Sequence, residues 1–413
     1  MPNKKIIIVV GIILLLIFGF IIYLFIPKNN AVIPTTGTST TVRARPGTYI
    51  TNIFNNGSST NQNTNQNNQQ TTPTQTNIVP SLRQISQNPI SGYNIFSLGT
   101  SSKVIYTDRA SGNTYQTNLD EIKLERPTIN PIPTVYEANW SNRANLVAMR
   151  FLKGNTDTIK TFIGQIATTS TLNSNLTGKF LPDNITQVAI NPNGDKIFYL
   201  VNGSTDSFGY IATTKITDGQ QKFTSPAKEW LVDWPKNDTI IMTTKPSAQA
   251  LGYVYSLNTN TGAFNKLYGG IVGLTTLFNK DLTKSLYSKS IDNAFTLGYY
   301  DAVKNETKTV SFKTLPEKCV WSNVSQGSVY CAIPAKIYSG DYPDIWYQGE
   351  VSFEDEIWRI DLDTNKTTRI YNVMSPVNYK GLDAINLKLN PTEKYLTFTD
   401  KNSLQLFVLN LTK

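Results

Sequence analysis

The chain has 413 residues, a formal net charge of +9 and no histidine. Without histidine, Ser-His-Asp catalysis, Cys-His catalysis and histidine-ligated metal sites are excluded. Five of the basic residues and none of the acidic ones lie in the first 80 positions, which leaves a net charge of only +4 on the rest of the chain. So small a charge on so long a segment does not predict a phosphate-binding surface, and no nucleic-acid partner is expected.

An apolar segment lies close to the N-terminus. Ile6 to Ile26 are uncharged and nearly all Ile, Leu, Val or Phe. As a helix the segment would be about 31 Å long, which matches a hydrocarbon core of about 30 Å. A cleaved signal peptide is the alternative, but it would be shorter and end in small residues, whereas this segment ends Tyr23-Leu-Phe-Ile-Pro27. We therefore predict that residues 1–29 form a cytoplasmic tip and one transmembrane signal anchor.

The charges around this segment predict its orientation. Lys4 and Lys5 precede it and Lys28 follows it. The positive-inside tendency favours a cytoplasmic N-terminus, which places the rest of the chain outside the cytoplasm. The predicted location is the cell membrane, crossed once, with the membrane itself as one partner.

A polar segment follows the anchor. From Asn55 to Thr76 every residue is Asn, Gln, Thr, Ser, Gly or Pro. Such a composition cannot bury enough apolar surface to offset the entropy cost of ordering. We predict that residues 30–80 form a disordered tether, and about fifty flexible residues reach roughly 40 Å.

Residues 81–413 contain a recurring unit, in which an apolar strand ends in an aromatic or Asn and is followed by a short polar turn and an alternating strand. Successive anchor positions are 42, 50, 44, 44, 43 and 68 residues apart. The anchors are Leu98, Trp140, Ile190, Trp234, Phe278, Trp321 and Leu389. A period in the forties with four short strands per unit is typical of a β-propeller. The predicted fold is all-β with seven blades, and six blades is the alternative.

The fourth unit illustrates the four strands. We predict them at 230–234, 239–244, 253–257 and 263–268. The seventh unit lacks its fourth strand, and the segment Ser81–Ser86 resembles the fourth strands of other units. Because an unpaired sheet edge is unfavourable, we expect this N-terminal segment to complete the last blade.

Two turn segments resemble a known family. Asn191-Pro-Asn-Gly-Asp-Lys-Ile-Phe198, and more loosely Asn390-Pro-Thr-Glu-Lys-Tyr-Leu-Thr397, are similar to the turn element of TolB-like, WD-type propeller repeats. The resemblance covers the repeat region in outline and these two copies closely. TolB-like propellers usually have six blades, whereas seven units are counted here. The resemblance implies an extracytoplasmic binding platform, and a turn element indicates fold rather than activity.

The two cysteines, Cys319 and Cys331, fall on the first two strands of the sixth unit, with the turn midway between them. They would lie opposite each other across a hairpin, within reach of a disulfide. Two free buried thiols are the alternative, and an extracytoplasmic location favours the disulfide.

An insertion of about 20 residues, Pro334 to Asp355, explains the longest spacing between anchors. Exposed aromatic residues among acidic ones are typical of a binding surface, and a flap that covers the propeller is the alternative. The candidate binding residues are Tyr338, Asp341, Tyr342, Asp344, Trp346 and Tyr347. This surface would share a face of the propeller with the loop 374–380.

Catalytic and cofactor motifs are not found. The sequence has no G-x-S-x-G motif, and Asp361-Leu-Asp363-Thr-Asn365 lacks the Gly and Glu of a calcium loop, which makes a hairpin turn the better interpretation. We predict no catalytic residue, metal or cofactor, and a binding or scaffold protein for a protein or envelope polymer rather than an enzyme. The alternative is a carboxylate-dependent enzyme that acts on an envelope glycan.

Overall fold

The computed structural model describes residues 81–166, 175–372 and 381–412. The predicted membrane anchor and tether, residues 1–80, lie outside this range, as does the loop 374–380. No helix among the described residues is long and apolar enough to cross a membrane.

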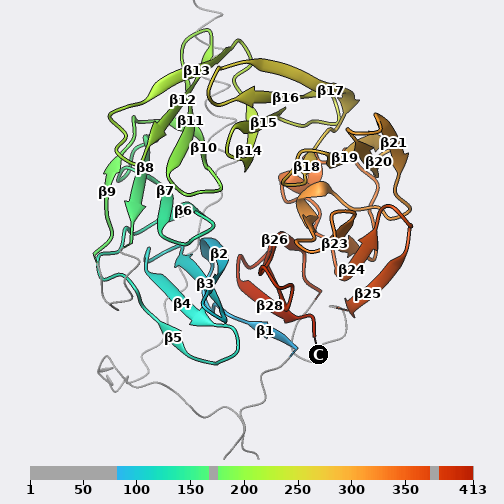
Figure 1. Ribbon diagram of the computed structural model, residues 1–413, viewed down its shortest axis with the longest axis horizontal. Coiled ribbons are helices and arrows are strands. Elements are labelled where there is room, and N and C mark those ends of the chain that lie inside the picture. Colours follow the sequence, from blue (N-terminus) through green and yellow to red (C-terminus); the bar gives the residue numbers. More distant parts are fainter. Residues whose placement is uncertain (1–80, 167–174, 373–380, 413) are drawn as a thin grey trace, which may run out of the picture. The chain divides into compact units, whose positions relative to one another are not determined.

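The described residues form seven four-stranded antiparallel sheets, which follow one another around a ring (Figure 1). Blade one consists of β2 (Ile90–Leu98), β3 (Ser101–Asp108), β4 (Thr114–Asn118) and β5 (Leu124–Glu125), and blade two of β6 (Val135–Trp140), β7 (Leu146–Leu152), β8 (Ile159–Gln165) and β9 (Thr177–Phe180). Blade three consists of β10 (Ile185–Ile190), β11 (Lys196–Asn202), β12 (Ser207–Thr213) and β13 (Gln220–Ser225), and blade four of β14 (Trp230–Lys236), β15 (Thr239–Thr244), β16 (Leu251–Asn258) and β17 (Phe264–Val272).

Blades five to seven complete the ring, and they confirm the seven-bladed propeller over the six-bladed alternative. Blade five consists of β18 (Thr276–Phe278), β19 (Lys284–Ile291), β20 (Ala294–Asp301) and β21 (Glu306–Thr309). Blade six consists of β22 (Cys319–Trp321), β23 (Ser328–Pro334), β24 (Asp355–Asp361) and β25 (Thr367–Asn372). Blade seven consists of β26 (Ala384–Leu389), β27 (Tyr395–Asp400), β28 (Leu406–Asn410) and β1 (Leu82–Gln84). Two short helices are described, the 3-10 helix η1 (Pro316–Lys318) and α2 (Asp344–Tyr347).

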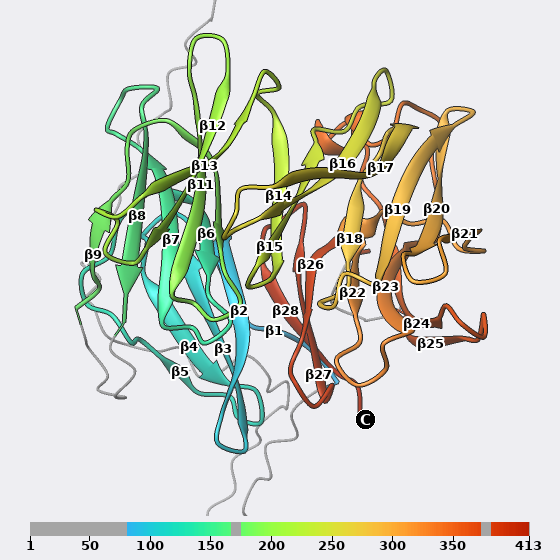
Figure 2. The ribbon, with the colours of Figure 1, turned by 45° about the horizontal axis from the view of Figure 1, so that its top comes forward.

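The ring closes where the two ends of the described chain meet. Strand β1 pairs antiparallel with β28, with Leu82 opposite Leu409 and Gln84 opposite Phe407. Figures 1 and 2 both show β1 in blue against the red strands of blade seven. The prediction that the N-terminal segment completes the last blade is confirmed.

The turn between the first two strands recurs from blade to blade. The Asn191 side chain accepts hydrogen bonds from the backbone N–H groups of Asp195 and Lys196, at 3.0 and 2.9 Å. Asn390 accepts one from Tyr395 N–H at 2.8 Å. These bonds satisfy backbone donors that the turn leaves without ladder partners. The motif is therefore a structural turn, as predicted.

One anchor residue needs correction. In blades one to three the first strand carries a bulge directly after Ile90, Val135 or Ile185. Counting from this bulge, the residue equivalent to Trp140 is Ile95, which is buried, whereas Leu98 is 55% exposed. Strand β2 ends at Leu98, but it extends three residues beyond Ile95, so the last residue of this strand is not its buried anchor.

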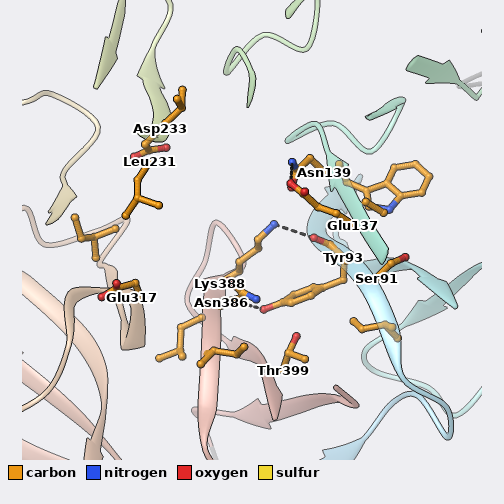
Figure 3. Close-up of a pocket in the computed structure, with 18 of the residues that line it drawn as sticks. Ser91, Tyr93, Glu137, Asn139, Leu231, Asp233, Glu317, Asn386, Lys388 and Thr399 are labelled. Atoms are coloured by element: carbon orange, nitrogen blue, oxygen red, sulfur yellow. Dashed lines mark hydrogen bonds between the residues drawn. The ribbon is translucent and has the colours of Figure 1, made fainter. Parts of the chain in front are cut away.

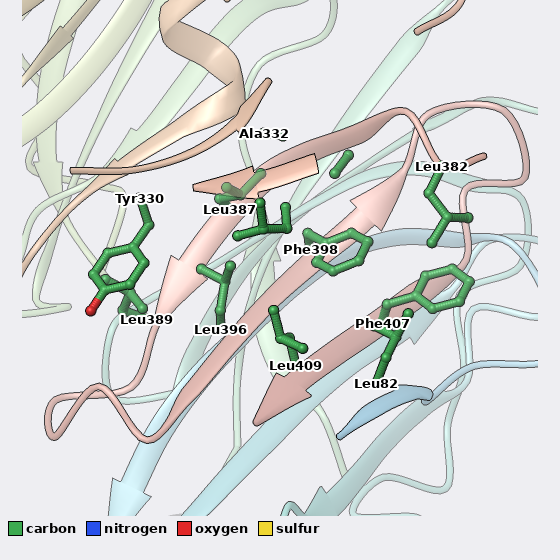
Figure 4. Packing of buried hydrophobic residues seen from close by; sticks show 12 residues of the cluster. Leu82, Tyr330, Ala332, Leu382, Leu387, Leu389, Leu396, Phe398, Phe407 and Leu409 are labelled. Atoms are coloured by element: carbon green, nitrogen blue, oxygen red, sulfur yellow. The ribbon is translucent and has the colours of Figure 1, made fainter. Parts of the chain in front are cut away.

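Apolar side chains from neighbouring blades form the core. One buried cluster joins Tyr330 and Ile357 of blade six to Phe398 and Phe407 of blade seven, and it includes Leu82 of β1 (Figure 4). Apolar contact across the blade boundary removes surface from water on both blades at once. The closing strand is thus held by side-chain packing as well as by backbone hydrogen bonds.

The disulfide is confirmed. Cys319 on β22 lies directly opposite Cys331 on β23, and the two residues are bridged. The insertion is also confirmed, because β23 ends at Pro334 and β24 begins at Asp355.

Candidate functional site

The first strands of six blades line a central cavity of about 810 Å³. Its wall combines apolar and polar side chains, and the charged ones are Arg109, Glu137, Asp233, Glu317 and Lys388. Figure 3 shows Lys388 reaching toward Tyr93, with Asp233 and Glu317 on a separate part of the wall. A concave site with few convergent polar groups is the default location for ligand binding.

Lys388, on β26, is the central cation of this cavity. Its Nζ donates to the backbone oxygen of Tyr93 at 2.8 Å and to Asn94 Oδ1 at 3.2 Å, and it lies 5.1 Å from the centre of the Tyr93 ring. Burial lowers the pKa of the Lys388 ammonium to about 8. An ammonium has three N–H donors, so one is left without an acceptor among the described residues.

Two carboxylates line another part of the wall. Asp233 on β14 contacts the solvent in the cavity, but protein surrounds it and this burial raises its pKa. Burial also raises the pKa of Glu317 in η1, although Glu317 accepts hydrogen bonds from Thr275 Oγ1 at 2.8 Å and from the Tyr347 hydroxyl. Both side chains can therefore accept hydrogen bonds from a ligand or exchange a proton with it.

A third carboxylate, Glu137, is already paired. Its Oε2 lies 2.5 Å from Arg150 Nη1, and its Oε1 accepts a bond from Asn139 at 2.8 Å. Arg109, a cation on the same wall, donates to the Tyr136 backbone oxygen at 2.9 Å. Lys388, Asp233 and Glu317 are consequently the groups with most capacity left for a ligand.

The insertion places its aromatic residues differently from the prediction of an exposed surface. Tyr342 is 0% exposed and Trp346 is 3% exposed. Both pack with Phe353, and the Trp346 indole donates to Asp383 Oδ2 at 2.9 Å. Their burial favours the flap interpretation for these two side chains.

The remaining candidate binding residues lie nearer the surface. Tyr338 is 48% exposed and Tyr347 is 39% exposed. Asp341 accepts from Gln249 Nε2 at 2.9 Å, and Asp344 accepts from the Ala248 backbone N–H at 2.6 Å. The two aspartates thus fasten the insertion to the segment between β15 and β16. Whether a partner binds here stays a prediction.

The insertion also reaches the cavity, because Tyr347 bonds to Glu317. Lys388, Asp233 and Glu317 are not among the site residues predicted from the sequence. The available signal was a charged residue on or beside the first strand of a blade, as in Val232-Asp233-Trp234 and Leu387-Lys388-Leu389. A charge at such a position is directed toward the propeller axis rather than toward outer solvent.

The segment Asp361–Asn365 forms the turn between β24 and β25. Asp361 Oδ1 accepts from Thr364 N–H and from its hydroxyl, both at 2.8 Å. Among the described residues, no group of three or more His, Cys, Asp or Glu side chains is arranged to hold a metal ion.

Comparison with known proteins identifies the fold only. No protein-family model and no curated protein matches the chain. The solved structure of oligogalacturonate lyase in complex with manganese is similar with a TM-score of 0.50 and 9% identity, over 80% of this chain and 100% of that one. The β-propeller domain of the Trilobed protease from Pyrococcus furiosus is similar with a TM-score of 0.49 and 13% identity, over 79% of this chain and 98% of that one. The tricorn protease is similar with a TM-score of 0.49 and 10% identity, over 81% of this chain and 34% of that one.

These comparisons correct one prediction and leave another open. The prediction that the chain is not an enzyme, which rests on the missing histidine and nucleophile motifs, is corrected, because an enzyme, oligogalacturonate lyase, has the same type of fold. The propeller is therefore no reason to deny this chain an activity. The TolB-like identity stays a prediction, since no family model matches.

Proposed function

We propose that this protein is a membrane-anchored, extracytoplasmic propeller that binds a carboxylate-bearing envelope polymer in its central cavity. The observation that carries the proposal is Lys388, a half-buried ammonium surrounded by protein on the cavity wall, with a free N–H and no carboxylate partner among the described residues. A buried charge is costly unless it is paired, so an anionic ligand group would stabilise it.

The rest of the cavity suits the other groups of such a ligand. Asp233 and Glu317 can accept hydrogen bonds from hydroxyl groups. The ligand would thus combine a carboxylate with several hydroxyls, as an acidic glycan does. The Cys319–Cys331 disulfide supports an oxidising, extracytoplasmic compartment.

A second candidate function is cleavage of the same polymer. One cavity holds carboxyl groups with raised pKa values and a lysine with a lowered one. Groups shifted toward neutral pH in this way are suited to general acid and base catalysis.

The site of partner contact is tested by photocrosslinking in intact cells. A photoreactive residue replaces Asn386, whose exposed side chain lines the cavity, or Tyr338 on the outside of the insertion. Adducts from position 386 that carry an acidic glycan support the proposal. Adducts from position 338 alone would contradict binding in the cavity and indicate that the partner binds the insertion. A protein adduct at position 386 would contradict an acidic glycan as the ligand and indicate a protein partner.

A further inference from the structure

Three charged side chains meet in a fully buried site beside the insertion. Lys318 is the last residue of η1, Asp355 is the first of β24, and Asp383 directly precedes β26. All three side chains are 0% exposed. Lys318 Nζ lies 2.7 Å from Asp355 Oδ2 and 2.5 Å from Asp383 Oδ1. The nitrogen is thus in contact with two carboxyl groups from different segments of the chain.

The two carboxyl groups have different surroundings. Asp383 Oδ2 accepts hydrogen bonds from Trp346 Nε1 at 2.9 Å, Phe353 N–H at 3.0 Å and Ser352 Oγ at 3.2 Å. Together with the Lys318 bond to Oδ1, these donors give both oxygens of Asp383 hydrogen-bond partners.

Asp355 lacks comparable support. Its Oδ2 accepts from Lys318 and from Ala384 N–H at 2.7 Å, but its Oδ1 is buried without any hydrogen-bond partner. Burial raises the pKa of Asp355 to about 6, so a larger fraction of this group is the neutral acid than for an ordinary aspartate. Asp383 is thus placed to take a proton from Lys318, and Asp355 has an oxygen without a partner that can leave.

The site excludes water and is walled by aromatic rings. Lys318 Nζ lies 5.4 Å from the centre of the Trp346 ring and 5.3 Å from that of Phe353. In such a site an ammonium and a carboxylate carry a desolvation penalty, which a neutral amide would remove. Because folding already holds the reacting groups in contact, the reaction does not carry the entropy cost of bringing them together.

We propose that Lys318 Nζ and Asp355 Cγ join in an intramolecular amide bond, formed by the folded protein itself with Asp383 as the proton carrier. Asp383 first takes a proton from the Lys318 ammonium. The Nζ lone pair then attacks Cγ of the neutral Asp355 carboxyl group, and the charge that develops on Oδ2 is stabilised by the Ala384 N–H.

The intermediate then collapses to the amide. The C–Oδ1 bond breaks, Oδ1 leaves as water with its own proton and one passed on by Asp383, and the second amine proton returns to Asp383. One amide and one water are formed, no oxidant is needed, and Asp383 ends as a neutral acid. No charge is then left in the buried site.

The bond would fasten the start of blade six to the end of the insertion. It connects positions 37 residues apart, and the disulfide lies within the loop that it closes. Residues 335–354, including α2, lie within the same loop. The end of the insertion is thereby fixed to the segment that precedes β22, independently of any ligand in the cavity.

Peptide mass spectrometry of the full-length protein, after reduction and trypsin digestion, tests this bond. Trypsin cannot cleave after an acylated lysine, so peptide 314–336 should remain intact and be joined to peptide 337–359, with the loss of one water. Separate peptides 314–318, 319–336 and 337–359 would overturn the proposal. A link from Lys318 to peptide 381–388, which contains Asp383, would overturn the choice of Asp355.

Variants check the chemistry without depending on one that fails to fold. Asp355→Asn should give the same linked peptides, now with the loss of ammonia, whereas Asp355→Ala and Lys318→Arg should give none. Glu356→Gln, which changes the neighbouring half-buried carboxylate that pairs with Arg369, should leave the link intact. Asp383→Asn should prevent the link in protein that still elutes as folded monomer, and an undiminished link there would refute the role of Asp383.

Discussion

Removal of the Trp346 side chain separates a structural role of the insertion from a partner-binding role. Trp346 is 3% exposed, stacks on Phe353 with ring centres 6.0 Å apart, and donates a hydrogen bond to Asp383. Truncating a buried tryptophan to alanine typically costs about 3–5 kcal/mol. This total includes the lost hydrogen bond to Asp383, which keeps its Ser352 and Phe353 donors, and we expect Trp346→Ala to lower the unfolding free energy by about 4 kcal/mol.

Two further variants separate the contribution of the Trp346 hydrogen bond to stability from that of its ring packing. Trp346→Phe keeps a ring on Phe353 and removes only the indole donor to a carboxylate, which is worth about 1.5–3 kcal/mol. Tyr338→Ala changes an aromatic residue of the same insertion that is 48% exposed, and surface substitutions of this kind usually change stability by about 0.5 kcal/mol or less.

The assay is urea unfolding of each full-length variant followed by far-ultraviolet circular dichroism. The expected order of stability is wild type and Tyr338→Ala together, then Trp346→Phe, then Trp346→Ala. If Trp346→Ala were as stable as the wild type, Trp346 would not anchor the insertion, and the described packing would be refuted.

Three further predictions concern the disulfide, the ring closure and the cavity lysine. Replacing Cys319 and Cys331 together by serine should cost about 3 kcal/mol in the same unfolding assay, the value expected for a loop of this length, and an unchanged midpoint would contradict it. Deleting residues 81–88 removes β1 from blade seven and should produce aggregates on size-exclusion chromatography, so a monomer with a cooperative melting curve would argue against closure by β1. The pKa of Lys388 is lowered to about 8 from 10.5, so the folded state loses this proton before the unfolded state does. As the pH rises from 8 to 10.5, the unfolding free energy of the wild type should therefore increase by about 1–3 kcal/mol relative to that of Lys388→Met. If the two unfolding free energies changed in parallel with pH, the pKa of Lys388 would not be lowered by its surroundings.

Much of the fold follows from the sequence because each blade is built from local contacts. The repeat spacing predicted seven blades, and β15 matches the predicted 239–244 strand. The closing strand was predictable from a missing fourth strand. The buried anchor of blade one was not, because β2 extends from Ile95 to an exposed Leu98, beyond the point where the first strands of blades two and three end.

The cavity groups were harder to predict than the fold. Lys388, Asp233 and Glu317 belong to three different blades and meet only when the ring closes. The burial of Tyr342 and Trp346 likewise depends on contacts with Phe353 and Asp383, which nothing in the composition of the insertion indicates. Sequence patterns report the period of a strand, but not which distant blade covers an inserted segment.

Binding of an acidic glycan in the cavity is tested most directly by calorimetric titration of a short oligogalacturonate into the full-length protein. The wild type should bind it, while its methyl ester, which lacks the charge, should bind weakly. Lys388→Met should lose this binding, and Lys266→Met, which removes a charge from an exposed position, should retain it. Equal affinity of the wild type and Lys388→Met, or of the acid and its ester, would contradict a carboxylate site at Lys388.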